Sequence, residues 1–409
     1  MKIIQINTVY EEKSTGRTCL EVEKALNKSG HTCVTAYGVG NHPKSDKAYK
    51  IDNKVEYLFH NIMSRITGLE GYFSFFATKR LVKFLEEEKP DIIHLRNLHG
   101  HYLNLPVLFR YLEKKQYPII QHLHDCWIYT GKCTYYTSQG CYKWKEECNN
   151  CPKKKAYPKS YWFDFSHKMR KDKERWYSKL NNLHVIGVSD WVTNEAKDSF
   201  FGHAKSISRI YNWINQDIFQ SYGSFENKAT RRKYGIPQDK YMIIGVSASW
   251  VEGSPRYDDF MKIAKTLSNN EVLVLVGRSE KPITNTNIIH IPFVNDTKEL
   301  AKIYSCADVY IHCSVEDTFG KVIAEALACG VPTIVYGITG CAEIPGEDCG
   351  IIVEPRNIDQ VRSAIEKMKQ KDKKQITNAC ITRVNELFNY EKNVSELINV
   401  YTRLCGYDE

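Results

Sequence analysis

Two carboxylates in one short segment have a spacing that suits the binding of a large phosphorylated ligand. The segment from Ala307 to Thr333 reads ADVYIHCSVEDTFGKVIAEALACGVPT, and Asp317 precedes Glu325 in it by eight positions. Eight positions along a helix span about 12 Å. That separation would let one carboxylate hold the sugar and the other the ribose of a sugar nucleotide. The alternative is an acidic first helical turn followed by a solvated helical Glu.

The context of these acids predicts a strand, a polar loop and a helix. The apolar run that ends at Cys313 indicates a buried strand, and a helix is expected from Phe319 until shortly before Gly330. Free backbone amides at the start of a helix bind anions. We therefore expect a bound diphosphate to meet the amides of Thr318, Phe319 and Gly320.

The elements that must position these groups alternate along the whole chain. Short apolar runs followed by amphipathic stretches are typical of parallel sheets with crossover helices. Two such series, separated by polar sequence near 215–228, predict an α/β fold with two Rossmann-like doubly wound lobes that face a central cleft. Strands are expected near 2–7, 32–37, 91–96, 119–124, 184–189, 242–246, 271–276, 288–291, 308–313 and 332–336.

The segment from Asp317 to Pro332 resembles the donor-binding signature of the family 4 retaining glycosyltransferases of GT-B fold. In that family two acids separated by seven residues precede an Ala-hydrophobic-Ala-Cys-Gly-x-Pro run. The resemblance covers nearly the whole chain. It implies catalytic-site roles for Asp317, which stands where the family more often has Glu, and for Glu325.

Other segments are similar to the same family. Leu123-His124-Asp125 resembles its His-Asp pair, which implies that His124 lies at the donor sugar and the acceptor hydroxyl. The resemblance also implies that Thr339 and Gly340 line the donor sugar, and that Gly16 belongs to a loop that closes over the diphosphate.

The chain departs from the family where cations normally neutralise the donor diphosphate. The family usually offers an Arg and then Lys-Gly after the first strand of the second lobe, whereas residues 246–260 here read VSASWVEGSPRYDDF. Arg256 is the first candidate for this role and Arg278 the second. Because family members use such cations in place of a metal, no catalytic metal is expected.

The net charge of +9 is concentrated in one segment. Residues 141–180 contain twelve Lys and Arg against five acids, interleaved with nine aromatic residues. Such a pattern suits an anionic lipid surface, a phosphorylated ligand or nucleic acid, and the alternative is a solvated basic face whose aromatic side chains pack into a core. Because the rest of the chain is nearly neutral, nucleic acid is not expected as a partner.

Four cysteines lie close together in the sequence, one just before this basic segment and three within its first part. Cys133, Cys141, Cys148 and Cys151 fall within nineteen residues, and the last two form a Cys-x-x-Cys pair. This spacing is compatible with a structural zinc, with four reduced thiols, or with disulfides. We expect these residues to staple a Cys-rich basic insertion at 133–179 within the first lobe.

Together these features predict a retaining glycosyltransferase that moves a hexose from a nucleoside diphosphate sugar to a lipid-linked glycan in surface polysaccharide biosynthesis. The predicted lobes are an acceptor-side lobe at 1–215 and a donor lobe at 216–389, with a helix at 390–409 packed back on the first lobe. The start of the chain has no apolar signal core, so a cytoplasmic location is expected, at the inner face of the membrane. The rivals are a sugar-nucleotide epimerase or phosphorylase of the same fold, and a zinc-stapled membrane or nucleic-acid adaptor.

Overall fold

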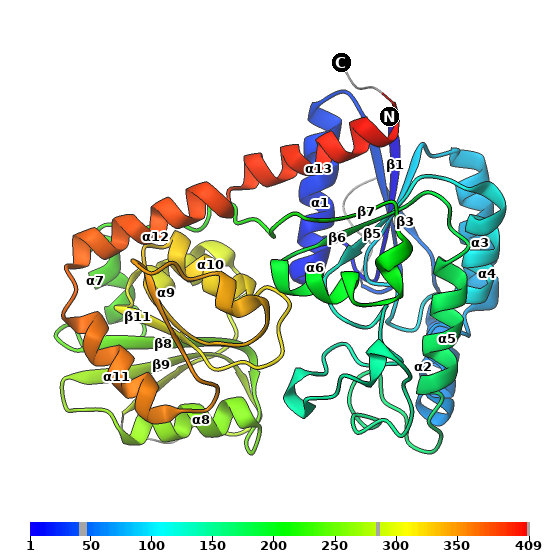
Figure 1. The fold of residues 1–409 in the computed structure, drawn as a ribbon. Helices are drawn as coiled ribbons and strands as arrows, with labels where there is room; N and C mark the ends of the chain where they lie inside the picture. The colour runs from blue at the N-terminus through cyan, green and yellow to red at the C-terminus, as the bar shows by residue number, and fades with distance from the viewer. Residues whose placement is uncertain (41–46, 284–286, 407–409) are drawn as a thin grey trace. The chain divides into compact units, whose positions relative to one another are not determined.

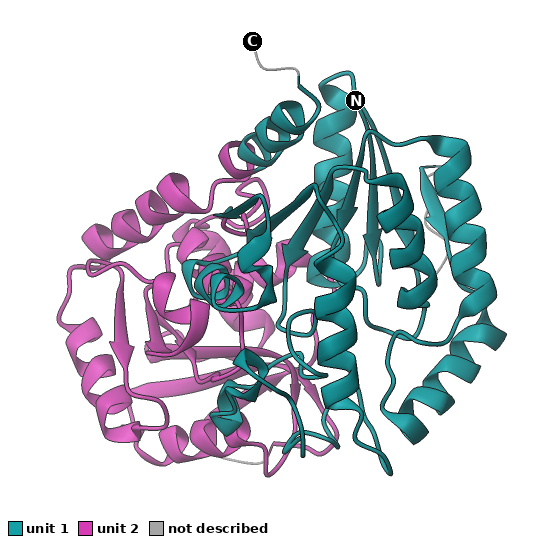
Figure 2. Cartoon of the chain, turned by 45° about the vertical axis from the view of Figure 1, so that its right-hand side comes forward, with its two compact units in different colours: residues 1–210, 394–409 teal, residues 211–393 magenta. Residues whose placement is uncertain are grey.

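The computed structural model describes residues 1–40, 47–283 and 287–406 and divides the chain into two compact units (Figure 2). Unit 1 comprises residues 1–210 and 394–409, and unit 2 comprises residues 211–393. The sequence placed the first boundary after residue 215 and the second after residue 389, and the structure places them at 210 and 393. Unit 2 is therefore continuous in sequence, whereas unit 1 is built from two segments.

Unit 1 contains a seven-stranded parallel sheet in the order β3-β2-β1-β4-β5-β6-β7, and helices connect its strands except from β2 to β3, where the described residues form none (Figure 1). Its strands are β1 (Lys2–Asn7), β2 (Thr32–Tyr37), β3 (Ala48–Lys50), β4 (Ile92–Leu95), β5 (Ile119–Leu123), β6 (Leu183–Gly187) and β7 (Ser206–Arg209). Its helices are α1 (Lys13–Lys28), α2 (Lys54–Thr67), α3 (Phe75–Glu88), α4 (Leu105–Lys115), α5 (Ser166–Tyr177), α6 (Asp190–Lys197) and most of α13 (Tyr390–Leu404).

Unit 2 contains a six-stranded parallel sheet in the order β10-β9-β8-β11-β12-β13. Its strands are β8 (Tyr241–Trp250), β9 (Glu271–Ser279), β10 (Ile288–Ile291), β11 (Val309–His312), β12 (Thr333–Tyr336) and β13 (Gly350–Val353). Its helices are α7 (Ser224–Lys233), α8 (Pro255–Lys265), α9 (Thr297–Ser305), α10 (Lys321–Ala328), α11 (Ile358–Lys369) and α12 (Lys373–Leu387).

Each sheet has a switch point, where the chain stops adding strands on one side and continues on the other. In unit 1 this point lies between β1 and β4, and in unit 2 it lies between β8 and β11. The helices that follow such neighbouring strands diverge, which leaves a crevice at the carboxyl ends of the strands. These two crevices are the places where the fold itself favours a ligand.

The Cys-rich insertion is shorter than the sequence suggested. The basic helix α5 is the crossover between β5 and β6, and its Trp176 stacks on Phe109 of α4 with ring centroids 5.6 Å apart. The irregular part therefore runs from residue 124 to residue 165, with only two short 3-10 segments at 137–139 and 143–145. Residues 166–177 belong to the core layers of unit 1.

The aromatics of the basic segment divide into two groups. Trp144, Trp176 and Tyr177 are buried in unit 1. For these residues the alternative interpretation, in which the aromatic side chains pack into a core, holds. The stretch 161–165 is different, because Trp162 is 67% exposed and Phe163 is 53% exposed. Among the described residues, no helix is both long enough and apolar enough to span a bilayer.

Candidate active site

The crevice of unit 2 brings Asp317 together with a histidine that the sequence analysis did not single out. His312, the last residue of β11, places its Nε2 3.0 Å from Oδ2 of Asp317. The hydroxyl of Tyr310 lies 2.9 Å from the other ring nitrogen, Nδ1. A neutral imidazole that accepts at Nδ1 and donates at Nε2 satisfies both contacts. His312 thus holds the carboxylate in one orientation at the end of the strand.

Arg256 reaches the same carboxylate from the other side of the switch point. It lies in the first turn of α8, where the side chain of Ser254 caps the helix, and it donates to the hydroxyls of Ser247 at 3.1 Å and Ser314 at 2.6 Å. Its guanidinium is 3.6 Å from Oδ2 of Asp317. β8 and β11 are adjacent, so the loops that follow them bring the two charges together.

The charge state of Asp317 follows from these contacts. Burial would raise the pKa of the carboxyl, but the hydrogen bond from His312 and the charge of Arg256 outweigh burial, and the net pKa is lowered. Burial lowers the pKa of His312, which favours its neutral form. The crevice therefore presents an ionised carboxylate beside a fixed guanidinium at neutral pH.

The second predicted acid, Glu325, lies inside α10 and is 7% exposed, so it is not a solvated helical Glu. Its Oε2 accepts from the hydroxyl of Tyr304 at 3.5 Å. The ring of Tyr304 packs edge-on against Tyr310 at 5.9 Å, and Tyr310 contacts His312. The two acids are thus connected through buried side chains of one unit.

The start of α10 differs from the sequence prediction. The helix begins at Lys321 rather than at Phe319, because Gly320 is the N-cap with φ of +77°. The amides that the helix leaves free are therefore those that follow Gly320, and not those of Thr318 and Phe319. The ring of Phe319 is buried against Tyr211 and Phe388, so this residue serves the core of unit 2.

The remaining predicted donor residues lie at different places in unit 2. Thr339 and Gly340 are buried in the 3-10 segment that follows β12, and Thr339 has a left-handed φ of 60°. Cys341 of the same segment has its Sγ within 4.8 Å of ligand atoms of both His312 and Asp317. Arg278, on β9, is exposed and its guanidinium stacks over Phe293 at 4.5 Å.

In unit 1 the predicted His124 follows β5 and is 9% exposed. Its ring packs on that of His122 at 4.4 Å. His122 stacks in turn on His94, whose Nδ1 lies 2.6 Å from the hydroxyl of Tyr401 in α13. His124 is thus the outermost of three histidines that rise from the core of unit 1 to the carboxyl edge of its sheet.

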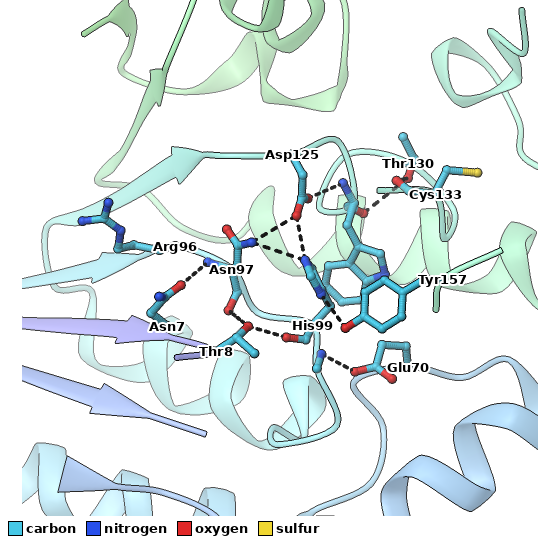
Figure 3. Close-up of polar contacts among 12 residues, drawn as sticks. Asn7, Thr8, Glu70, Arg96, Asn97, His99, Asp125, Thr130, Cys133 and Tyr157 are labelled. Carbon is cyan, nitrogen blue, oxygen red and sulfur yellow. Dashed lines mark hydrogen bonds and ion pairs between the residues drawn. The ribbon is translucent and has the colours of Figure 1, made fainter. Parts of the chain in front are cut away.

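The acid next to His124 pairs with a different histidine, His99, which the sequence analysis missed. Oδ2 of Asp125 is 2.6 Å from Nε2 of His99, and Nδ1 of His99 is 3.1 Å from the hydroxyl of Tyr157. Figure 3 shows these side chains pointing toward one another from three separate segments, with Asn97 completing the group. The signal was present in the sequence, because Asn97-Leu-His-Gly-His follows a buried strand at its carboxyl end.

Beneath this group lies a buried carboxylate that fixes the loop after β4. Glu70 is 1% exposed, accepts from the amides of Gly100 at 2.8 Å and His101 at 2.7 Å, and lies 2.5 Å from the His101 ring. Burial would raise the pKa of Glu70, but His60 and His101 lower it strongly. His60 also accepts from the amide of Gly71, so its Nε2 is already occupied. The group is therefore an anchor for the loop rather than a metal site.

Gly16 does not lie in a loop, as the resemblance implied, but in the first turns of α1. A Cβ at this position would lie 3.1 Å from the carbonyl carbon of Tyr10 and 3.2 Å from the amide nitrogen of Glu11. The glycine is thus required because the loop after β1 folds closely over the helix.

The four clustered cysteines line one small cavity of about 20 Å³ in the insertion. The sulfurs of Cys133 and Cys151 are 3.9 Å apart, and the amide of Gly131 donates to the sulfur of Cys148 at 3.3 Å. No three of these sulfurs lie within 4.8 Å of one another. All fourteen cysteines of the chain lie in the described residues and are free thiols.

Two parallel doubly wound sheets, each with polar side chains at its switch point, define a glycosyltransferase fold of the GT-B type. Sucrose-phosphate synthase from Thermosynechococcus elongatus superposes with a TM-score of 0.70 at 16% identity over the whole of both chains. Anabaena Alr3699/HepE in complex with UDP-glucose gives a TM-score of 0.64 at 13% identity, over 98% of this chain and 100% of that one.

Sequence comparisons identify the family. The model of Glycosyltransferase Family 4 matches residues 15–218, and that of Glycosyl transferases group 1 matches residues 226–382. The putative colanic acid biosynthesis glycosyl transferase WcaC of Escherichia coli is 24% identical over 88% of this chain and 89% of its own length. The chain belongs to the family 4 glycosyltransferases and is a glycosyltransferase.

Proposed function

We propose that the protein transfers a hexose, with retention of configuration, from a nucleoside diphosphate sugar to a hydroxyl of a lipid-linked glycan. The observation that carries this proposal is the pairing of Arg256 with Asp317 at the switch point of unit 2. A fixed guanidinium there suits a diphosphate, and an ionised carboxylate beside it suits sugar hydroxyls. The solved relative that carries UDP-glucose supports the same class of donor.

The residues of unit 2 would divide the donor among them. Arg256 would neutralise the diphosphate, the amides after Gly320 would bind its oxygens, and Asp317 would accept from the hexose. Glu325 would hold the ribose. In the reaction the acceptor oxygen bonds to the anomeric carbon on the face from which the diphosphate leaves, and the acceptor proton passes to the released phosphate oxygen. No protein nucleophile is required for that step.

Unit 1 would supply the acceptor side. His124 lies at the carboxyl edge of its sheet, and His99, Asp125 and Tyr157 form a second polar group there. Parallel sheets bind ligands at this edge. We assign His124 to the reacting region and the His99 group to the positioning of acceptor hydroxyls.

A panel of sugar nucleotides tests the proposal and its rivals. Thermal stabilisation by one donor, slow hydrolysis of that donor and its acceleration by a glycan acceptor would support transfer. An epimerase would instead convert the sugar nucleotide without any acceptor, and an inert adaptor would be stabilised by none of them. No stabilisation and no hydrolysis with any nucleoside diphosphate hexose would refute the proposal.

We also propose that unit 1 rests on an anionic membrane surface. Helix α2 presents an apolar stripe to solvent, in which Val55 is 78%, Leu58 57% and Phe59 56% exposed, whereas its buried side carries His60 and Ser64. This distribution is the reverse of that in an ordinary surface helix. Lys54 and Arg65 of the same helix are also exposed. An anionic bilayer offers both an apolar interior and a negative surface.

The exposed stretch 161–165 continues this surface, because the amide of Tyr161 donates to the carbonyl of Arg65 at the end of α2. Vesicles of neutral lipid, with and without an anionic lipid, test the surface by co-sedimentation. We expect binding that requires the anionic lipid, falls with salt and is reduced in Phe59→Ser with Trp162→Ser. Binding that ignores both anionic lipid and salt would contradict the proposal.

The cysteine cavity carries a further proposal, a structural zinc. Four thiolates at about 2.3 Å from zinc place neighbouring sulfurs about 3.8 Å apart. Cys133 and Cys151 have nearly this separation at 3.9 Å, and the other two sulfurs would move closer on binding, because no three of the four lie within 4.8 Å of one another. A cavity of about 20 Å³ accommodates one ion. Two buried ammonium groups, Lys132 and Lys173, donate to backbone carbonyls nearby and have no carboxylate within 4 Å among the described residues. Four thiolates around a divalent ion would leave two negative charges, which these ammonium groups would balance.

Elemental analysis of the purified chain tests this centre. One zinc per chain is expected, with its loss in Cys151→Ser and its retention in Cys405→Ser, a partly exposed cysteine outside the cluster. Cobalt substitution should give the absorption bands of a tetrahedral thiolate site. A metal-free chain with unchanged melting behaviour would refute the centre.

A further inference from the structure

A pocket in unit 1 occupies the switch point between β1 and β4. Its volume is about 390 Å³, within the range of roughly 300 to 1,000 Å³ that is usual for small-molecule sites. The loop after β1 contributes Thr8 and Val9, and the loop after β4 contributes Asn97 and His99. The pocket therefore lies where the topology of this sheet favours a ligand.

Among the described residues, three cations line this pocket and no acid does. Lys13 comes from the start of α1, Arg65 from the last turn of α2 and Lys159 from the insertion. None of the three has an ion-pair or hydrogen-bond partner for its side chain within the part of the chain that the structure describes. Like charges gathered without a counter-charge repel one another, so the pocket is electrostatically suited to an anion.

The fold brings two of these cations together from distant parts of the sequence. The amide of Tyr161 donates to the carbonyl of Arg65 at 2.8 Å, and a Cβ on Gly68 would lie 2.9 Å from the hydroxyl of Ser160. The insertion thus packs closely on the end of α2 and delivers Lys159 to the same rim. The placement of the two charges is built into the packing rather than left to a free loop.

Two acids that contact histidines of the pocket lining are already engaged. Asp125 is paired with His99 and Glu70 with His101, and the two histidines line the pocket in front of them. The remaining lining groups are neutral donors and acceptors. Among them the amide oxygen of Asn61 is buried and has no hydrogen-bond partner among the described residues. An orphan of this kind indicates that a donor, such as a sugar hydroxyl, completes the site.

We propose that this pocket binds the acceptor through an anionic group, a phosphate or a sugar carboxylate, held by Lys13, Arg65 and Lys159. The inference rests on the proposed transfer function and names the chemical class of its acceptor. The anion lies at the rim formed by the three cations, and the sugar hydroxyls meet Asn61 and the hydroxyl of Tyr157, which His99 orients. A neutral sugar makes only the second set of contacts and binds weakly.

Calorimetric titration of the full chain with three probes tests the pocket. The probes are glucose 1-phosphate, glucuronate and glucose, and all titrations are carried out in an Arg256→Gln background to remove binding at the donor crevice. At least one charged probe is expected to bind more than about tenfold more tightly than glucose, with an affinity that falls as salt is raised. Preference for glucose 1-phosphate identifies a phosphate acceptor, and preference for glucuronate identifies a carboxylate.

The matched variants are two double substitutions of equal charge. Arg65→Gln with Lys159→Gln should weaken binding of the charged probe by about 25-fold, because each exposed charge pair contributes about fivefold. The affinity for glucose should not change. Lys83→Gln with Lys171→Gln, both on exposed helix positions, should change nothing. Equal binding of all three probes, or wild-type affinity in the first pair, would overturn the inference.

Donor hydrolysis separates this inference from the proposed function. In the chain with native Arg256, hydrolysis of the sugar nucleotide should be unchanged by the Arg65 and Lys159 substitutions. If hydrolysis occurs and no charged probe binds, the pocket inference alone fails. If a charged probe binds and no sugar nucleotide does, the proposed transfer function fails instead.

Discussion

Substituting Arg256 with Gln should separate its contribution to donor binding from its contribution to folding. The guanidinium is one third exposed and makes two hydrogen bonds to serines and one ion pair of 3.6 Å with Asp317. A partly exposed pair of this length contributes about 1 kcal/mol or less to the free energy of unfolding. The variant should therefore fold, with a small decrease in melting temperature.

The effect on the donor should be larger. Hydrogen bonds to a charged group contribute about 1.5 to 3 kcal/mol each, so loss of one guanidinium contact to a diphosphate raises the donor Kd by about 10- to 150-fold. Arg256→Lys keeps the charge but loses the planar guanidinium. Its donor Kd should lie between those of the wild type and Arg256→Gln. Isothermal titration with the donor that stabilises the wild-type chain gives all three values.

The pH profile adds an independent measure. The charge of Arg256 is one of the influences that lower the pKa of Asp317 against its burial, so the substitution raises that pKa. Donor affinity on the acid side should then begin to fall at a higher pH in Arg256→Gln than in the wild type. A donor Kd within twofold of wild type and an unshifted acid limb would together refute the assignment. A large decrease in unfolding free energy would instead assign Arg256 to the fold.

Three further substitutions test other parts of the structure. Glu325→Ala removes a buried carboxylate that contacts Tyr304 and should weaken donor binding at least about tenfold, whereas unchanged donor affinity and turnover would contradict its role. Glu70→Gln should lower the free energy of unfolding by about 3 kcal/mol in urea, because it breaks a buried pair. The pKa of Glu70 is lowered in the folded state, so this difference should be present above about pH 4.3 and shrink as the pH falls. Gly277→Ala should destabilise unit 2 by more than about 2 kcal/mol in the same assay, because φ is +144° and a Cβ would lie 2.0 Å from the carbonyl oxygen of Ser247.

The strands that the sequence predicted are the apolar ones. β1, β2 and β10 match the expected residues, because each forms a compact run that its sheet buries or half-buries. β3, β7 and β13 were not predicted, and all three lie at the edge of a sheet. β3 and β7 contain polar residues, which a partly exposed edge tolerates and which remove the apolar signal. β13 is apolar but only four residues long.

The candidate site was predictable only where its chemistry is local in sequence. The spacing of Asp317 and Glu325 could be read directly, but the orientation of Asp317 depends on His312 and on Arg256, which comes from a different strand connection. His99 itself lies in a polar run after a buried strand, but its pairing with Asp125 could not be predicted, because the two residues are 26 positions apart. A sequence pattern can identify a candidate carboxylate, but the histidine that it contacts depends on the tertiary fold.

Unit 2 interrupts the sequence of unit 1, and this has a consequence for synthesis of the chain. Unit 2 is continuous and can fold as soon as its own residues have left the ribosome. The sheet of unit 1 is translated first, yet the buried His94 must wait for Tyr401, its hydrogen-bond partner in α13. The half of the enzyme that is made first is therefore the half that is completed last, and it needs protection from aggregation for the whole time in which unit 2 is made.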